Sequence, residues 1–268
     1  MPLTPAHAAA VIPLRQWKAC FWLSPLVVGS MAPDYAYFIY LPQQYRNVGH
    51  SALGLVLFCI PVGLAVLYAY HAFFKRPLVL LMPRILRDKL WPHCGPFPVL
   101  PLRRLAWCAA LIYLGAVTHV LWDGVTHDDG WAVREWPQIR AIVFMILGHQ
   151  VHLYALLQYG SSLLGLALLA WWSWRWYRTA PAGQAPADWP LVRVARPTVA
   201  AAMVLFGTGT GIACGLAYAL RLPGPFPIRE FCAATFIVGV DAFGLALIVF
   251  CLLVNLRGRH ATASECGD

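Results

Sequence analysis

The sequence predicts an all-α, polytopic transmembrane helix bundle with five clear spans and a broken or re-entrant N-terminal segment. Of its 268 residues, 60% are hydrophobic and only 12% are charged, whereas an ordinary soluble domain carries roughly 25% charged residues. Several apolar stretches reach or exceed the roughly 18 residues that a helix needs to cross a bilayer. The lipid bilayer is therefore the expected environment of the chain.

Five apolar runs are long enough to cross a membrane as helices, and each is expected to do so. They are Ala52–Phe74, Leu105–Val125, Leu153–Trp174, Val199–Leu220 and Cys232–Leu256. The stretch Ala19–Leu41 is also apolar, but two prolines, a glycine and an aspartate interrupt it. Such breaks are typical of a re-entrant segment whose irregular backbone is buried in protein.

A cleaved signal peptide is the competing interpretation of the N-terminal segment. Arg15 and Lys18 precede an apolar run that ends in Gly29-Ser-Met-Ala32, which resembles a cleavage site. The basic region would, however, be unusually long and contain three prolines, and the chain continues apolar past the supposed cut. We therefore expect residues 1–32 to be retained.

The basic residues orient the chain in the membrane. The formal net charge is +9, but Lys and Arg lie in short segments between apolar runs, so nucleic acid is not an expected partner. Under the positive-inside rule, the basic loop 75–104, the arginines between residues 175 and 196, and the C-terminus are cytoplasmic. Loop 126–152 then lies on the outer face, and the expected location is the inner (cytoplasmic) membrane.

An Ala-, Pro- and Gly-rich stretch, residues 179–188, divides the chain as a flexible linker. We predict a site-bearing membrane helical domain (1–176), a cytoplasmic linker (177–197), a C-terminal transmembrane helix pair (198–256) and a cytoplasmic tail (257–268). In the helix pair, three glycines recur at four-residue spacing, a pattern that lets transmembrane helices pack closely. These are Gly207, Gly211 and Gly215.

Acidic residues inside apolar segments are functional candidates, because an ionisable group in hydrocarbon is energetically expensive. Asp34, Asp123 and Asp241 qualify. The densest group is His119, Asp123 and His127, whose four-residue spacing puts them on one helix face. Imidazole and carboxylate suit a divalent transition metal such as zinc, or these groups instead hydrogen-bond one another and stabilise the bundle. The eight cysteines contain no Cys-x-x-Cys pair, so they predict neither a disulfide framework nor a cysteine zinc site.

Connectivity brings further candidates to the same membrane face. His50 precedes the first span while Asp123 and His127 close the second, which runs in the opposite direction. His149 and His152 precede the third span and fall on that face too, and the connection from Asp34 to His50 is too short to hide another crossing.

The membrane face on which His7 lies depends on the path of the N-terminal segment. If residues 19–41 cross fully, His7 lies on the opposite face from Asp34; if residues 8–32 form a short hairpin in the bilayer, the two meet. The interrupting prolines and glycine favour the hairpin. Three other histidines are expected to be interfacial or solvated, and Asp241 either lines the site or bonds a neighbouring helix. These histidines are His71, His93 and His260.

Several motifs together resemble an uncharacterised bacterial membrane family, domain-of-unknown-function family 4184. They are the opening Met1-Pro-Leu-Thr-Pro-Ala-His7, Gly29-Ser-Met-Ala-Pro-Asp34, Gly49-His-Ser51, Thr118-His-Val-Leu-Trp-Asp-Gly-Val-Thr-His127 and Leu157-Gln-Tyr-Gly-Ser-Ser162. The resemblance covers most of the chain and names no reaction.

The order of His and Asp residues is also similar to membrane-bound metal-dependent hydrolases and, remotely, to zinc-dependent phospholipase C. This resemblance implies a divalent metal, with zinc the expected ion. It makes His7, Asp34, His50, His119 and Asp123 metal ligands, and adds His127 and His149 as weaker candidates. One departure is that Leu153 stands where a glutamate would follow His149, which argues against a full multi-zinc centre.

The leading functional expectation is a metal-dependent hydrolase that acts on a phosphoester or phospholipid head group at the outer interface. Asp34 and Asp123 are its candidate catalytic residues, as base or ligand. A transporter or proton-coupled carrier that uses Asp34, Asp123 and Asp241 is the alternative, and a non-catalytic membrane scaffold is a third possibility.

Two arginines in the outer loop have two interpretations. Arg134 and Arg140 lie near Trp131 and Trp136, so they either hold an anionic head group or anchor the loop at the membrane interface. Anchoring is favoured, because Trp with scattered Arg is ordinary membrane-boundary composition.

Overall fold

The computed structural model describes residues 3–16, 23–38, 45, 47–97, 101–146, 149–183, 185, 196–224 and 226–265. Within these residues the chain is helical almost throughout, and its two strands form one short hairpin. The predicted all-α class is therefore confirmed.

Five helices among the described residues are long and apolar enough to cross a membrane, as the sequence predicted. They are Ala52–Leu81, Leu102–Glu135, Leu153–Thr179, Arg196–Ala219 and Glu230–Leu256. The first continues beyond its predicted end at Phe74, because Lys75 buries its stem and donates a hydrogen bond from Nζ to the Gly95 carbonyl (2.7 Å). The chain is thus a multi-pass membrane protein.

The chain divides into two compact units, which are described separately. The first comprises residues Met1–Tyr68 and Pro98–Thr179, and the second comprises Ala69–Phe97 and Ala180–Asp268. Residues 69–97, which the sequence analysis placed in the domain 1–176, are therefore grouped with the C-terminal helices. The side-chain amide of Asn255 donates a hydrogen bond to the Phe73 carbonyl (3.0 Å), which explains part of this grouping.

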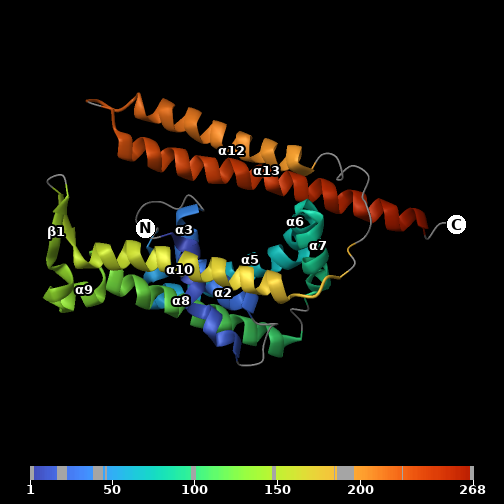
Figure 1. Ribbon diagram of the computed structural model, residues 1–268, viewed down its shortest axis with the longest axis horizontal. Coiled ribbons are helices and arrows are strands. Elements are labelled where there is room, and N and C mark those ends of the chain that lie inside the picture. Colours follow the sequence, from blue (N-terminus) through green and yellow to red (C-terminus); the bar gives the residue numbers. More distant parts are fainter. Residues whose placement is uncertain are drawn as a thin grey trace. The chain divides into compact units, whose positions relative to one another are not determined.

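In the first unit, three longer helical stretches follow one another along the chain. The first contains α4 (Ala52–Gly54), η7 (Leu55–Cys59) and α5 (Ile60–Ala69), and the others are α8 (Leu102–Thr126) and α10 (Leu153–Thr179). Figure 1 shows α8 and α10 lying side by side. Helix α8 carries part of the candidate site, and α10 packs beside it.

The N-terminal segment is a chain of short helical pieces that returns on itself. They are η1 (Thr4–His7), α1 (Ala8–Val11), η2 (Ile12–Gln16), α2 (Leu23–Met31), η4 (Ala32–Asp34) and α3 (Tyr35–Phe38). The Thr4 hydroxyl donates a hydrogen bond to Asp34 Oδ2 (2.6 Å), so the beginning and end of the segment meet. This is the arrangement expected of a re-entrant hairpin. Residues 17–22, between η2 and α2, lie outside the described residues.

Two glycines allow α2 to cross α8 at close range. A Cβ atom on Gly29 would overlap the backbone of Ile112, and one on Gly115 would overlap the backbone of Leu26 and Ser30. Apolar side chains from α1, α2 and α8 pack beside the crossing. The backbone of α2 is therefore held directly against the face of α8 that carries His119.

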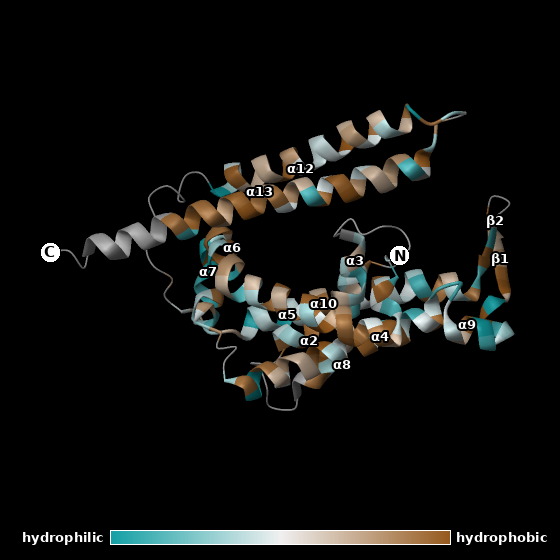
Figure 2. Ribbon diagram, turned by 180° about the vertical axis from the view of Figure 1, so that it is seen from behind, coloured by the Kyte–Doolittle hydropathy of each residue, from teal (hydrophilic) through white to brown (hydrophobic). Residues whose placement is uncertain are grey.

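The second unit is built around a long pair of helices, α12 (Arg196–Ala219) and α13 (Ile228–Glu265). Figure 2 shows hydrophobic residues along both helices. The close packing predicted from the glycine repeat is confirmed, because Cβ atoms at all three positions would overlap α13. Shorter elements complete the unit: η8 (Tyr70–Phe74), α6 (Lys75–Leu81), α7 (Arg84–Leu90) and η9 (Trp91–Cys94). Much of the predicted linker, residues 184 and 186–195, lies outside the described residues.

Loop 126–152, which the sequence analysis expects on the outer face, contains structure that the sequence analysis did not predict. It holds α9 (Trp131–Glu135), η10 (Pro137–Arg140) and a hairpin of β1 (Ile142–Ile146) and β2 (His149–His152). The strands are antiparallel, with Ile142 opposite His152 and an irregularity between Ile142 and Phe144. The run Ile-Val-Phe-Met-Ile is rich in residues that favour strands, and this signal was available in the sequence.

Candidate metal centre

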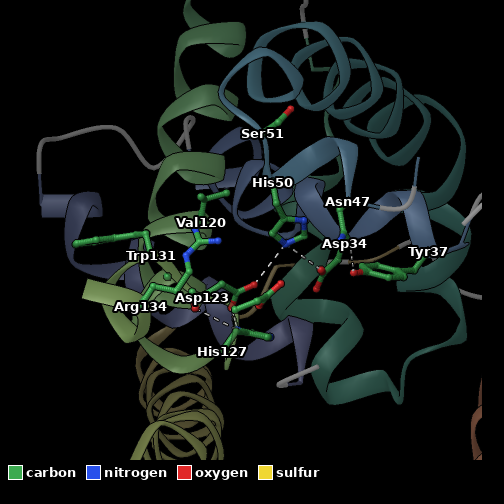
Figure 3. Close-up of a pocket in the computed structure, with 13 residues that line it drawn as sticks. Asp34, Tyr37, Asn47, His50, Ser51, Val120, Asp123, His127, Trp131 and Arg134 are labelled. Atoms are coloured by element: carbon green, nitrogen blue, oxygen red, sulfur yellow. Dashed lines mark hydrogen bonds and ion pairs between the residues drawn. The ribbon is translucent and has the colours of Figure 1, made fainter. Parts of the chain in front are cut away.

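Four side chains from three separate segments of the first unit come together at one point. Asp34 ends η4, His50 ends η6 (Val48–His50), and His119 and Asp123 lie one turn apart on α8. Each offers one ligand atom, and these four atoms all lie within 4.8 Å of one another. Figure 3 shows Asp34, His50 and Asp123 directed toward one another.

The separations match the spacing that a small cation requires. His119 Nε2 lies 3.1 Å from Asp123 Oδ2 and 3.7 Å from Asp34 Oδ1, and His50 Nε2 lies 3.4 Å and 3.7 Å from the same two oxygens. Tetrahedral zinc with bonds of about 2.0–2.1 Å places its ligands roughly 3.3–3.4 Å apart. A zinc-sized ion fits this donor set with small adjustments.

A backbone carbonyl orients His119. The ring atom Nδ1 lies 2.7 Å from the Ser30 carbonyl oxygen, which accepts a hydrogen bond only if Nδ1 carries the proton. In the neutral ring, Nε2 then presents a lone pair to the carboxylate of Asp123. Metal-binding histidines are commonly held in this way, with the second nitrogen donating to a carbonyl.

Contacts with neighbouring parts of the N-terminal segment position Asp34 and His50. Thr4 occupies Oδ2 of Asp34 and leaves Oδ1 facing the two histidines. Gly49 packs on the backbone of Pro33, where a Cβ atom would overlap, and this brings His50 beside Asp34. Ser51 then caps α4, its hydroxyl accepting a hydrogen bond from the Gly54 backbone N–H (3.0 Å).

His7 completes the wall of the site. Its ring stacks on that of His119 with 3.8 Å between centroids, and its Nε2 lies 3.5 Å from Asp123 Oδ1. Burial, with the neighbouring His119 as a smaller cause, lowers the pKa of His7 from its usual 6.5 to about 3. His7 is therefore neutral near pH 7, with one ring nitrogen able to act as a ligand.

Several buried polar atoms of this group have no hydrogen-bond partner. They are both ring nitrogens of His7, Nδ1 of His50, Nε2 of His119 and Oδ1 of Asp123. The short contact between His119 Nε2 and Asp123 Oδ2 is thus not an aligned hydrogen bond. Buried polar atoms are rarely left unsatisfied in proteins, so this group of unpaired ligand-type atoms fits a bound cation or a shared proton.

His127 lies at the edge of the group rather than within it. The sequence analysis placed it on the same helical face as His119 and Asp123, but α8 ends at Thr126 and His127 has an extended backbone. Its Nδ1 is 3.4 Å from Asp123 Oδ1, and its Nε2 is 3.2 Å from the side-chain amide nitrogen of Gln158. His127 therefore contacts a candidate ligand and α10 together.

Two other candidates are not brought to this group by the structure. The side chain of His149 lies outside the described part of the chain, although its backbone belongs to β2. Asp241 lies on α13, in the second compact unit.

Sequence reasoning missed three groups that support the site: the Thr4 hydroxyl, the Ser30 carbonyl and the Gln158 amide. Thr4 and Ser30 lie within motifs already singled out, three and four residues from His7 and Asp34. Their roles depend on how separate segments meet, which spacing along the chain does not reveal.

A cavity of about 440 Å³ opens beside the cluster. Its described lining combines the candidate ligands with residues from the outer loop. These are Asp34, Tyr37, Asn47, His50, Ser51, Val120, Asp123, Gly124, His127, Asp129, Gly130, Trp131 and Arg134. The cluster is therefore accessible to a small molecule (Figure 3).

Comparison with known proteins gives one match. A family model described as a domain of unknown function, DUF4184, matches residues 1–255. No curated protein and no solved structure matches the chain.

Proposed function

The chain belongs to DUF4184, a family of unknown function, and we propose that it is a membrane-embedded, metal-dependent hydrolase. Its substrate would be a phosphoester or a phospholipid head group. The metal would be a divalent ion, with zinc favoured by the mixture of imidazole and carboxylate donors.

The observation that carries the proposal is the unsatisfied contact between His119 and Asp123. Ser30 accepts the proton of His119 Nδ1, so Nε2 faces Asp123 Oδ2 at 3.1 Å. A lone pair against a carboxylate is repulsive unless a proton or a cation lies between them. Two further donors, from His50 and Asp34, surround the same point, and His7 lies beside them near Asp123 Oδ1, which favours a cation that accepts several ligands.

A bound divalent ion would lower the pKa of a water ligand and so supply a nucleophile at neutral pH. His50, His119, Asp34 and Asp123 would hold the ion, and Thr4 would keep Asp34 in position. Asp123 Oδ1, which has no hydrogen-bond partner, would accept the proton that the water releases. The neutral ring of His7 would pack beside His119 and provide a fifth donor.

The size of the cavity supports a small anionic substrate. Its volume of about 440 Å³ falls within the roughly 300–1,000 Å³ typical of small-molecule sites. The positive-inside rule puts this end of the helices on the outer face of the cytoplasmic membrane, where a phospholipid head group would be within reach.

Metal content of purified protein tests the proposal. We expect the parent to retain a divalent metal when purified without chelators, and we expect His119→Ala and Asp123→Asn to lose most of it. His71→Ala is the matched control, because His71 lies in the second unit, where its ring Nδ1 contacts Lys75 Nζ at 3.0 Å. Elemental analysis and thermal unfolding should be measured on the same samples.

The outcomes separate the candidate functions. Loss of metal in the two site variants alone, with all proteins folded, supports the metal centre. If the parent binds no metal, the hydrolase proposal fails, and the cluster is a proton relay or a packing device.

A further inference from the structure

We propose that Arg134 binds the anionic oxygens of a phosphate group in the cavity that the candidate metal ligands also line. This inference rests on the proposed function and narrows its substrate to molecules that carry an anionic phosphate. It also assigns different roles to the two arginines of the outer loop.

Arg134 and the candidate metal ligands line the same cavity. Arg134 lies on α9, and the cavity joins it to Asp34, His50 and Asp123. Figure 3 shows its guanidinium directed toward Val120, on the side of the cavity that holds His50. A molecule in the cavity can therefore meet the metal ligands and this cation together.

The guanidinium of Arg134 has no ion pair or hydrogen bond with any residue that the structure describes. It is also the only Lys or Arg among the described residues of the cavity lining. Arg140 differs, because its Nη2 donates a hydrogen bond to the Asp128 carbonyl (3.3 Å) and it does not line the cavity. Arg140 therefore stabilises the loop through its hydrogen bond to Asp128, whereas the guanidinium of Arg134 is available to a ligand.

The short helix that carries Arg134 is fixed against α8. The indole of Trp131 packs on Gly124 so closely that a Cβ atom there would overlap its ring. The Gly130 N–H donates to the His127 carbonyl (2.9 Å), and Ala132 and Val133 are fully buried. The base of α9 is thus held in place, and the ligand would not have to order this loop on binding, which favours affinity.

Phosphate is the anion that this pairing of groups recognises best. A guanidinium presents a planar fork of donors that binds two phosphate oxygens at once. Asp34, His50 and Asp123 line the same cavity, and the divalent ion that they would hold would supply further positive charge to the phosphate. A peptide or a neutral ester offers no second anionic oxygen to such a clamp.

The test measures phosphate binding by calorimetry, with metal-loaded protein whose metal content has been determined. We expect Arg134→Gln to bind inorganic phosphate at least about tenfold more weakly than the parent, since a charge-assisted bidentate contact is lost. Arg134→Lys should recover part of the affinity. Arg140→Gln is the matched control and should bind phosphate as the parent does, and all variants should hold the same amount of metal.

Two probes distinguish a lipid from a soluble source of the phosphate. Glycerol phosphate in detergent and phosphatidylglycerol in nanodiscs present the same group with and without acyl chains. Arg134→Gln should weaken binding of whichever probe the parent binds, and a parent that binds only the nanodisc probe identifies a lipid substrate.

Each contrary result has a separate meaning. Metal-loaded parent that binds none of these phosphates, or Arg134→Gln that binds them as tightly as the parent, overturns the role of Arg134 and leaves the metal centre standing. A parent without metal overturns the proposed function and this inference with it.

Discussion

His119 in the first unit and His71 in the second are both histidines of membrane-spanning helices, yet their surroundings differ. His119 faces two carboxylates and stacks on another imidazole. His71 contacts Lys75 and Tyr70, and it stacks on the phenyl ring of Phe97 with 3.9 Å between centroids. No carboxylate approaches His71 among the described residues.

The difference lies in how each group of polar side chains is satisfied. Near His71, the ammonium of Lys75 bonds the Gly95 carbonyl and Arg76 Nε bonds the Cys94 carbonyl (3.3 Å), so the cations are used to hold the backbone. Nε2 of His71 also lacks a hydrogen-bond partner, but around His119 five such buried atoms come from four residues that contact one another: His7, His50, His119 and Asp123. Buried polar groups that bond backbone stabilise a fold, whereas ligand-type groups that converge on one point suit a bound ion.

The largest expected effect on the surroundings of His119 comes from a substitution that moves α2 away from α8. In Gly115→Ala, the added Cβ atom would overlap the Leu26 carbonyl and the Ser30 backbone. We expect a loss of about 1–3 kcal/mol in unfolding free energy, together with reduced metal content, because Ser30 orients His119. Thermal unfolding and elemental analysis of the purified variant measure both effects.

Two other alanine variants serve as controls for Gly115→Ala. Gly160 on α10 has open space around it, so Gly160→Ala should be neutral or slightly stabilising. Gly211→Ala would clash with the Thr235 carbonyl in the second unit, and it should lower stability while metal content per folded molecule stays at the parent level. Metal loss in Gly211→Ala would show that the site depends on the whole bundle.

A smaller effect is expected from the group that holds Asp34. Thr4→Val keeps the shape of the side chain but removes the hydroxyl that bonds Asp34 Oδ2. We expect metal affinity to fall about tenfold, as when other partners of metal ligands are removed. Competition with a chromophoric chelator measures the change, and Thr208→Val, which alters a hydroxyl bonded only within α12, should leave the affinity unchanged. Equal affinities in the two variants would mean that Thr4 does not position a ligand.

Much of the fold, and part of the candidate site in the first unit, was predictable from the sequence. The five spans follow from apolar length alone, and antiparallel connectivity was enough to expect Asp34, His50 and Asp123 at one end of the helices. The re-entrant path of His7 was favoured only because Pro25, Gly29 and Pro33 interrupt an apolar run.

The features of the fold and site that could not be predicted depend on contacts between distant segments, which leave no periodic signal in the sequence. The Ser30 carbonyl reaches His119 because Gly29 and Gly115 let two backbones meet, and neither glycine identifies its partner in the sequence. Residues 69–97 group with the C-terminal helices through contacts such as the bond from Asn255 to Phe73, whose partners lie far apart in the chain. The different roles of Arg134 and Arg140 likewise depend on how one short helix packs on α8.

The smallest expected effect concerns His127, which the sequence placed among the ligands and the structure places at their edge. Its Nδ1 is 3.4 Å from Asp123 Oδ1 and its ring contacts Gln158, outside the group of four that surrounds the candidate ion. His127→Ala should therefore weaken metal binding by less than the roughly tenfold expected when a direct partner of a ligand is lost, and by far less than His50→Ala. Chelator competition on both variants decides the matter: if His127→Ala abolishes binding as His119→Ala should, His127 is itself a ligand, and the ion lies nearer to Asp123 Oδ1 than to Oδ2.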